Sequence, residues 1–212
     1  KYNLDIIWPV IPQFEWISQY LSSDRITFVS TESDFTHKEL YNSQCNIIVD
    51  RPDVMYIPLQ HADQHNLHSS VMDSKYKFVS LSYENWADFI LFNRNKKTES
   101  KLFYDILNLT LDEKYVVVNK NYGSPPTSLV CPHLNIETNI KIVNLEFIDD
   151  ITLLDWCMVL ENAYQIHTVE TSLNFVIEKL PRCTGLNMYS KWTPPNYNHV
   201  RHLFRSDWIY HY

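Results

Sequence analysis

The chain has 212 residues, of which 45% are hydrophobic and 20% charged, and its formal net charge is -7. This balance predicts a folded protein with a sizeable core and excludes disorder and a coiled coil. The acidic charge argues against a nucleic-acid-binding face, which is normally basic. The sequence has no run of roughly 18 apolar residues that would span a bilayer, and its first eight residues lack the pattern of a signal peptide. We therefore expect a soluble protein with no transmembrane segment.

The cysteines and glycines exclude further classes. The four cysteines, Cys45, Cys131, Cys157 and Cys183, are scattered without a CxxC pair, which argues against a zinc site or a disulfide framework and favours a reduced, cytoplasmic setting. Glycine occurs only twice, so neither a GxGxxG nor a Walker loop is present. A phosphate would have to be bound by helix N-termini and side chains instead.

In the first half, the apolar patterns predict short alternating elements. Strands are expected at residues 4–8, 25–30, 46–49 and 54–59, and helices at residues 13–21, 37–41 and 85–92. Residues 76–82 are expected to form a further strand or the start of an element that leads into the helix at 85–92. The polar, basic stretch 93–97 indicates a domain boundary, giving an N-terminal lobe at 1–95 and a C-terminal lobe at 96–212.

The second half has a more regular pattern. Strands are expected at residues 115–118, 141–145, 164–169 and 186–189, and helices at residues 98–109, 149–162, 173–180 and, in the tail, 196–212. Strands that alternate with helices predict βαβ units and a parallel sheet, so the fold class is α/β.

The strongest motif lies between a strand and a helix at residues 166–180. Thr171 and Ser172 place hydroxyls at the start of the helix, where free backbone N–H groups attract anions. Glu170 ends the strand, at the edge where open α/β sheets bind ligands, and its carboxylate could accept hydrogen bonds from ribose hydroxyls. The alternative is that Thr171 or Ser172 only caps the helix.

A second candidate is the loop after the strand at 115–118. Lys120 could neutralise a diphosphate, and Gly123 would allow close backbone approach. Asn121 and Ser124 belong to the same loop as binding candidates. An ordinary connection with a solvated lysine is the alternative.

Two weaker candidates lie in the first half. Asp5, in an apolar segment at the start of the fold, could act as a general base in a cleft, or be a cap or a surface carboxylate. His61, Asp63, His65 and His68 form a metal-like cluster without an HExxH pattern, and we expect a polar surface loop there, with His61 as a reserve contact to substrate. No metal or cofactor is predicted.

The order of these motifs resembles GT-B glycosyltransferases, most closely their heptosyltransferase-like branch. That family has an Asp-bearing strand before an apolar stretch and Pro, similar to residues 4–9, and a strand of the yvvv type with a phosphate-contacting loop, similar to residues 114–124. It also has a V-x-T-small segment before a helix, similar to residues 169–172. The chain departs from the pattern at Leu4, Glu170 and Ser172, where the family has Gly, Asp and Gly, and the family is typically longer.

The resemblance implies two small Rossmann-like lobes with parallel sheets and a metal-independent glycosyltransferase. Asp5 would be the catalytic base, Lys120 would contact phosphate, and Glu170, Thr171 and Ser172 would hold the nucleotide. The donor would be a nucleotide-diphosphate sugar and the acceptor a hydroxyl of a glycan or glycoconjugate. One alternative is a non-catalytic α/β module that binds a partner or glycan. Another enzyme class such as a methyltransferase is a third, against which the missing glycine-rich loop counts.

Overall fold

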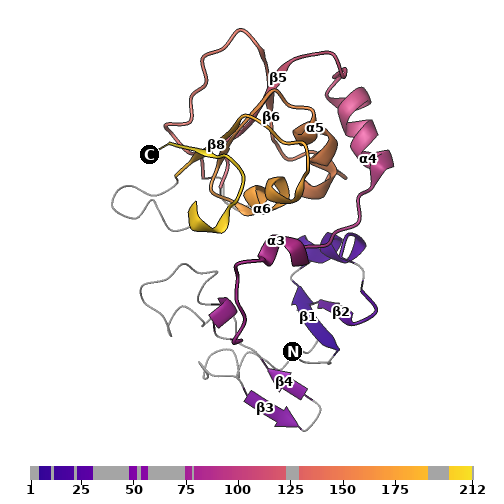
Figure 1. The fold of residues 1–212 in the computed structure, drawn as a ribbon. Helices are drawn as coiled ribbons and strands as arrows, with labels where there is room; N and C mark the ends of the chain where they lie inside the picture. The colour runs from indigo at the N-terminus through magenta and orange to yellow at the C-terminus, as the bar shows by residue number, and fades with distance from the viewer. Residues whose placement is uncertain are drawn as a thin grey trace. The chain divides into compact units, whose positions relative to one another are not determined.

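A computed structural model describes residues 5–10, 12–21, 23–30, 48–51, 54–56, 75–77, 79–122, 129–190 and 201–211. The chain divides into two compact units, Lys1–Phe92 and Asn93–Tyr212 (Figure 1). The division falls between residues 92 and 93, at the start of the polar stretch 93–97. The sequence predicts the boundary within this stretch, between residues 95 and 96. Each unit is described by itself below.

The described residues of unit 1 form two small sheets. Its elements are β1 (Ile6–Val10), the 3-10 helix η1 (Pro12–Gln19), β2 (Ile26–Ser30), β3 (Ile48–Arg51), β4 (Val54–Tyr56) and α3 (Trp86–Phe89). Strands β1 and β2 are parallel and joined through η1, whereas β3 and β4 are antiparallel. A strand–helix–strand connection between parallel neighbours is the βαβ arrangement that the sequence predicts.

Two predictions for unit 1 are wrong. The first strand was expected to stop at Pro9, but β1 continues through it, and Pro9 is opposite Val29. Proline is tolerated in edge strands, where its missing N–H costs no ladder bond. The strand reading of 76–82 is wrong in the described residues of this range: residues 75–77 make a helical turn, and Ser80 has a φ of 55°, which extended backbone does not allow. The predicted helix at 37–41 lies outside the described residues.

Unit 2 is built on a five-stranded, fully parallel sheet. Its strands are β5 (Tyr115–Asn119), β6 (Lys141–Asn144), β7 (Gln165–Val169), β8 (Leu186–Tyr189) and β9 (Ile209–His211), in the spatial order β6-β5-β7-β8-β9. All five residues of β5 are buried, as expected for a parallel strand covered on both faces. The prediction of an α/β class with a parallel sheet is confirmed for this unit.

Helices cover one face of this sheet (Figure 1). They are α4 (Lys96–Ser100), the π-helix η3 (Lys101–Ile106), the 3-10 helix η4 (Leu153–Trp156), α5 (Cys157–Glu161) and α6 (Ser172–Lys179). Tyr115 Oη donates to the backbone oxygen of Val159 on α5 at 2.7 Å, which fixes α5 against this face. The predicted helix 149–162 begins only at Leu153, because Asp150 has a φ of 63°.

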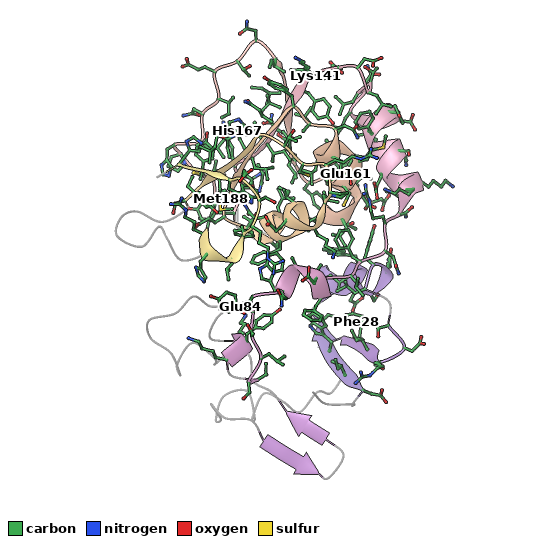
Figure 2. All side chains as sticks on the ribbon, in the orientation of Figure 1. Phe28, Glu84, Lys141, Glu161, His167 and Met188 are labelled. Carbon is green, nitrogen blue, oxygen red and sulfur yellow. The ribbon has the colours of Figure 1, made fainter. Side chains whose placement is uncertain are left out.

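The opposite face is covered by chain without a helix among the described residues. Side chains alternate along each strand, so Val116 and Val118 of β5 point away from the helices. They pack with Cys131 and Leu134, from the connection between β5 and β6, in a buried apolar cluster. His167 and Met188, labelled in Figure 2, mark the two faces: His167 is on this one and Met188 is on the helical one.

In its described residues, 201–211, the tail does not form the predicted helix. It forms the short 3-10 helix η5 (Arg201–Leu203) and then the edge strand β9. The Glu178 carboxylate of α6 explains this: Oε1 accepts from the backbone N–H groups of Arg205 (2.5 Å) and Ser206 (2.8 Å), and Oε2 accepts from Trp208 Nε1 (3.0 Å). These three bonds hold the chain in the extended path that leads into β9.

Candidate functional site

The sheet order of unit 2 defines a topological switch point. From β5 the chain passes to β6 on one side, and from β6 it crosses back over β5 to β7 on the other. The segments that follow β5 and β7 therefore leave the sheet on opposite faces. Open α/β sheets bind ligands in the crevice outside the carboxyl ends of the strands at such a point, so this edge is the candidate site.

The two motifs that the sequence singled out meet at this switch point. Strand β5 ends at Asn119 and is followed by Lys120 and Asn121, while β7 ends at Val169 and is followed by Glu170. Asn119 pairs in register with Thr168, so the two segments begin on neighbouring strands at the same edge. The structure thus brings the Lys120 loop and the Glu170 turn together.

The loop after β5 is held by short backbone bonds. The N–H of Tyr122 donates to Leu129 O and the N–H of Cys131 donates to Lys120 O, both at 2.9 Å, around an antiparallel bridge between Asn121 and Val130. Lys120 is half-buried and Asn121 is exposed. Gly123 and Ser124 lie outside the described residues, and their assignment stays a prediction.

Helix α6 begins directly at the switch point. Thr171 is its N-cap, with φ -144° and ψ 179°, and forms a capping box with Asn174, whose Oδ1 accepts from the Thr171 backbone N–H at 2.8 Å. The local capping role that we considered as the alternative is therefore present. Capping does not exclude ligand binding, because the remaining first-turn N–H groups and the helix dipole still favour an anion.

Glu170 and Ser172 flank this cap. Ser172 is exposed at the first position of α6. Glu170 is buried, and its backbone N–H donates to Tyr189 O at 3.1 Å, which ties the turn to β8. A carboxylate and a hydroxyl on either side of a helix N-terminus suit the ribose and phosphate parts of a nucleotide.

Asn119, which the sequence analysis placed at the start of this loop without a role of its own, joins the two motifs. It ends β5 at 4% exposure, and its Nδ2 donates to Thr168 Oγ1 at 3.0 Å and to Thr171 Oγ1 at 3.4 Å. The sequence feature that could have identified Asn119 is its position, a carboxamide at the end of a buried, valine-rich strand.

A second polar group, which sequence reasoning missed, lies on the helix-free face of the sheet. His167 Nδ1 is 3.1 Å from Tyr189 Oη, the Tyr189 ring stacks on His211 (4.3 Å, 9°), and His211 Nε2 is 3.0 Å from Asn187 Oδ1. Burial, with a smaller effect from His211, lowers the pKa of His167 to about 4. His167 is therefore neutral at physiological pH.

The remaining candidates lie in unit 1 or outside the description. Asp5 is exposed immediately before β1. His61 and its histidine neighbours fall outside the described residues. Within the described ranges, no three His, Cys, Asp or Glu side chains gather in a way that could hold a metal ion, and Cys131, Cys157 and Cys183 are unpaired.

No helix in the described part of the chain is long and apolar enough to cross a membrane. No family model, curated protein or solved structure matches this chain. Its function is therefore inferred from the geometry of the switch point and from the resemblance of the motifs.

Proposed function

We propose that this chain is a GT-B-like glycosyltransferase that binds a nucleotide-diphosphate sugar at the switch point of unit 2, with the two units as its Rossmann-like lobes. One observation carries the proposal: the Lys120 loop and the Glu170 turn follow neighbouring strands, β5 and β7, at the same edge of the sheet. Because the sequence separates them by some fifty residues, only the fold brings them together.

Each residue has a role that its chemistry supports. Lys120 would neutralise the diphosphate, and Thr171 and Ser172 would donate to its oxygens beside the positive end of α6. Glu170 would accept hydrogen bonds from the ribose hydroxyls. The diphosphate gains negative charge as it departs. Hydrogen-bond donors that are already in place therefore stabilise the transition state more than they stabilise the bound nucleotide sugar.

Asp5 is proposed as the base that deprotonates the acceptor hydroxyl of a glycan or glycoconjugate. This assignment rests on the resemblance of the first strand. Asp5→Asn should abolish sugar transfer while leaving donor affinity unchanged, because a base acts on the acceptor. Asp24→Asn, which changes another exposed carboxylate of unit 1, is the matched control.

The donor site is tested by calorimetry and thermal shift with UDP-, GDP-, ADP- and TDP-sugars. We expect one of these donors to bind and stabilise the wild-type chain. Thr171→Ala/Ser172→Ala should weaken that donor at least tenfold, since a hydrogen bond to a charged group contributes about 1.5–3 kcal/mol. Lys120→Ala should also weaken it, whereas Lys97→Ala, at an exposed lysine of α4, should not.

The outcomes separate the alternatives. Unchanged binding in the Thr171→Ala/Ser172→Ala variant would remove the switch point as the donor site. If no nucleotide sugar binds the wild-type chain, a non-catalytic partner- or glycan-binding module is the better description. Donor binding without transfer or donor hydrolysis would point to a degenerate transferase.

A further inference from the structure

Asn119 is positioned to set the orientation of the Thr171 hydroxyl at the switch point. It is the last residue of β5, and its side chain is on the helical face of the sheet, toward the start of α6. Its Nδ2 reaches two hydroxyls of the neighbouring strand and turn, Thr168 Oγ1 and Thr171 Oγ1. At 4% exposure, this carboxamide is fixed by protein contacts.

Counting protons fixes the direction of these bonds. The Thr168 hydroxyl donates its only proton to Val169 O at 3.0 Å, so Thr168 Oγ1 can only accept from Asn119. The amide nitrogen of Asn119 must therefore face both hydroxyls. Its second proton goes to Thr171 Oγ1, which makes Thr171 an acceptor of this bond.

Thr171 consequently keeps its own hydroxyl proton. Within the described ranges, no carbonyl or carboxylate accepts that proton. The hydroxyl is at the N-terminus of α6, where the helix dipole favours a negative ligand. Thr171 Oγ1 also accepts from the backbone N–H of Asn174 in the capping box. With the Asn119 bond, both lone pairs of this oxygen are used, which leaves the hydroxyl as a donor toward the ligand side.

Asn174 gives independent evidence for an acceptor ligand at this place. It is 1% exposed, and its Oδ1 accepts from the Thr171 N–H. Its Nδ2 has no hydrogen-bond partner among the residues that the structure describes. A buried amide donor without a partner is unfavourable and needs an explanation. The unmet donor belongs to the same carboxamide whose Oδ1 caps the Thr171 N–H at the start of α6.

We propose that Asn119 is a positioning residue, which orients the Thr171 hydroxyl to donate to a diphosphate oxygen, and that the Asn174 amide is the second donor of this site. The inference rests on the proposed nucleotide-diphosphate site and names the residues that select the diphosphate within it. Asn119 acts through Thr171 and does not itself contact the ligand.

The test is a mutant cycle measured by calorimetry on the full chain. The probes are UDP, GDP, ADP and TDP, each compared with its own nucleoside. Asn119→Ala and Thr171→Val should each weaken the diphosphate that binds wild-type about tenfold and leave nucleoside affinity unchanged. The double variant should be no weaker than Thr171→Val, because residues acting through one bond are not additive. Thr171→Ser, which keeps the hydroxyl, should retain affinity.

Controls separate positioning from folding. Asn144→Ala removes the same side chain from the end of the neighbouring strand β6, where it is exposed, and should bind like wild-type. If Asn119→Ala fails to fold, the isosteric Asn119→Asp replaces it: its carboxylate would take the Thr171 proton and weaken diphosphate binding. Asn174→Asp, which keeps the oxygen that caps the Thr171 N–H and removes the second donor, should also weaken the diphosphate selectively.

Two failures are distinguishable. If wild-type binds none of the four nucleoside diphosphates, the proposed donor site is wrong, and this inference falls with it. If wild-type binds one of them but the Asn119 variants bind it equally well, or the Asn119 and Thr171 effects add, Asn119 does not position Thr171. In that case the donor site itself stands.

Discussion

The two faces of the unit 2 sheet handle buried polar groups in different ways. On the helical face, charges are paired: Arg94 bridges the Glu99 and Glu161 carboxylates, and Glu178 holds three donors of the tail. On the other face, neutral groups such as His167 and Tyr189 bond to one another. The helical face should therefore be sensitive to loss of a partner, and the other face to protonation.

The largest expected effect is at Arg94. Glu99 is completely buried, and its hydrogen bonds to Arg94 raise the arginine pKa above its usual value. Arg94→Met would leave that carboxylate with Lys96, 3.4 Å away, as its one remaining cation among the described residues. We expect urea unfolding to show a loss of about 3–5 kcal/mol, the effect of removing one partner of a buried pair.

The matched variants decide whether charge is the cause. Arg94→Met/Glu99→Gln, which removes the buried charge as well, should recover a large part of the loss. Lys97→Met changes an exposed lysine of α4, the helix that contains Glu99, and should leave the free energy of unfolding close to that of wild-type. Equal losses in the single and double variants would show that packing of the arginine, and not its charge, stabilises this face.

The second effect is at Glu178, the carboxylate that fixes the tail. Glu178→Gln keeps one acceptor oxygen and removes the charge, so at least one of the three bonds is lost. We expect a destabilisation of about 2 kcal/mol and faster hydrogen exchange in residues 204–211. Glu137→Gln, at an exposed position, is the control. Unchanged hydrogen exchange in the tail of Glu178→Gln would contradict the role of Glu178 in holding the tail.

The third prediction concerns the other face and is a pH dependence. Burial lowers the pKa of His167 from 6.5 to about 4, so the unfolded chain binds a proton more readily than the folded one. The contribution of neutral His167 to the free energy of unfolding is therefore complete above pH 6.5 and is lost as the pH falls toward about 4. Unfolding measured across this window should show stability rising with pH.

His167→Gln should flatten this slope, since it keeps a hydrogen-bonding side chain that does not titrate. Some slope should remain, because burial also lowers the pKa of His211. His202→Gln, at an exposed histidine of η5, should leave the slope as in wild-type. An unchanged slope in His167→Gln would show that this histidine does not couple folding to pH.

The sequence predicted the parts of this arrangement that depend on local pattern. The apolar strands β5 to β8 and the helix after Glu170 follow from residue spacing. Strand β9 could not be found in this way, because residues 209–211 are extended through their pairing with β8, and the chain before them is held by Glu178, some thirty positions earlier. The Asn119 to Thr171 contact likewise depends on which strands are neighbours, which no spacing along the chain reveals.

The smallest expected loss of stability is at the hydrogen bond between the sheet and α5. Tyr115 Oη donates to Val159 O at 2.7 Å in a buried setting, and burial raises the pKa of Tyr115 above its usual value. Tyr115→Phe keeps the ring and removes this bond, so we expect a loss of about 1 kcal/mol in urea unfolding. Tyr104→Phe, at an exposed ring, should change little. A loss as large as that of Arg94→Met would mean that a neutral bond stabilises the helical face as strongly as the ion pairs, and the contrast between the two faces would fail.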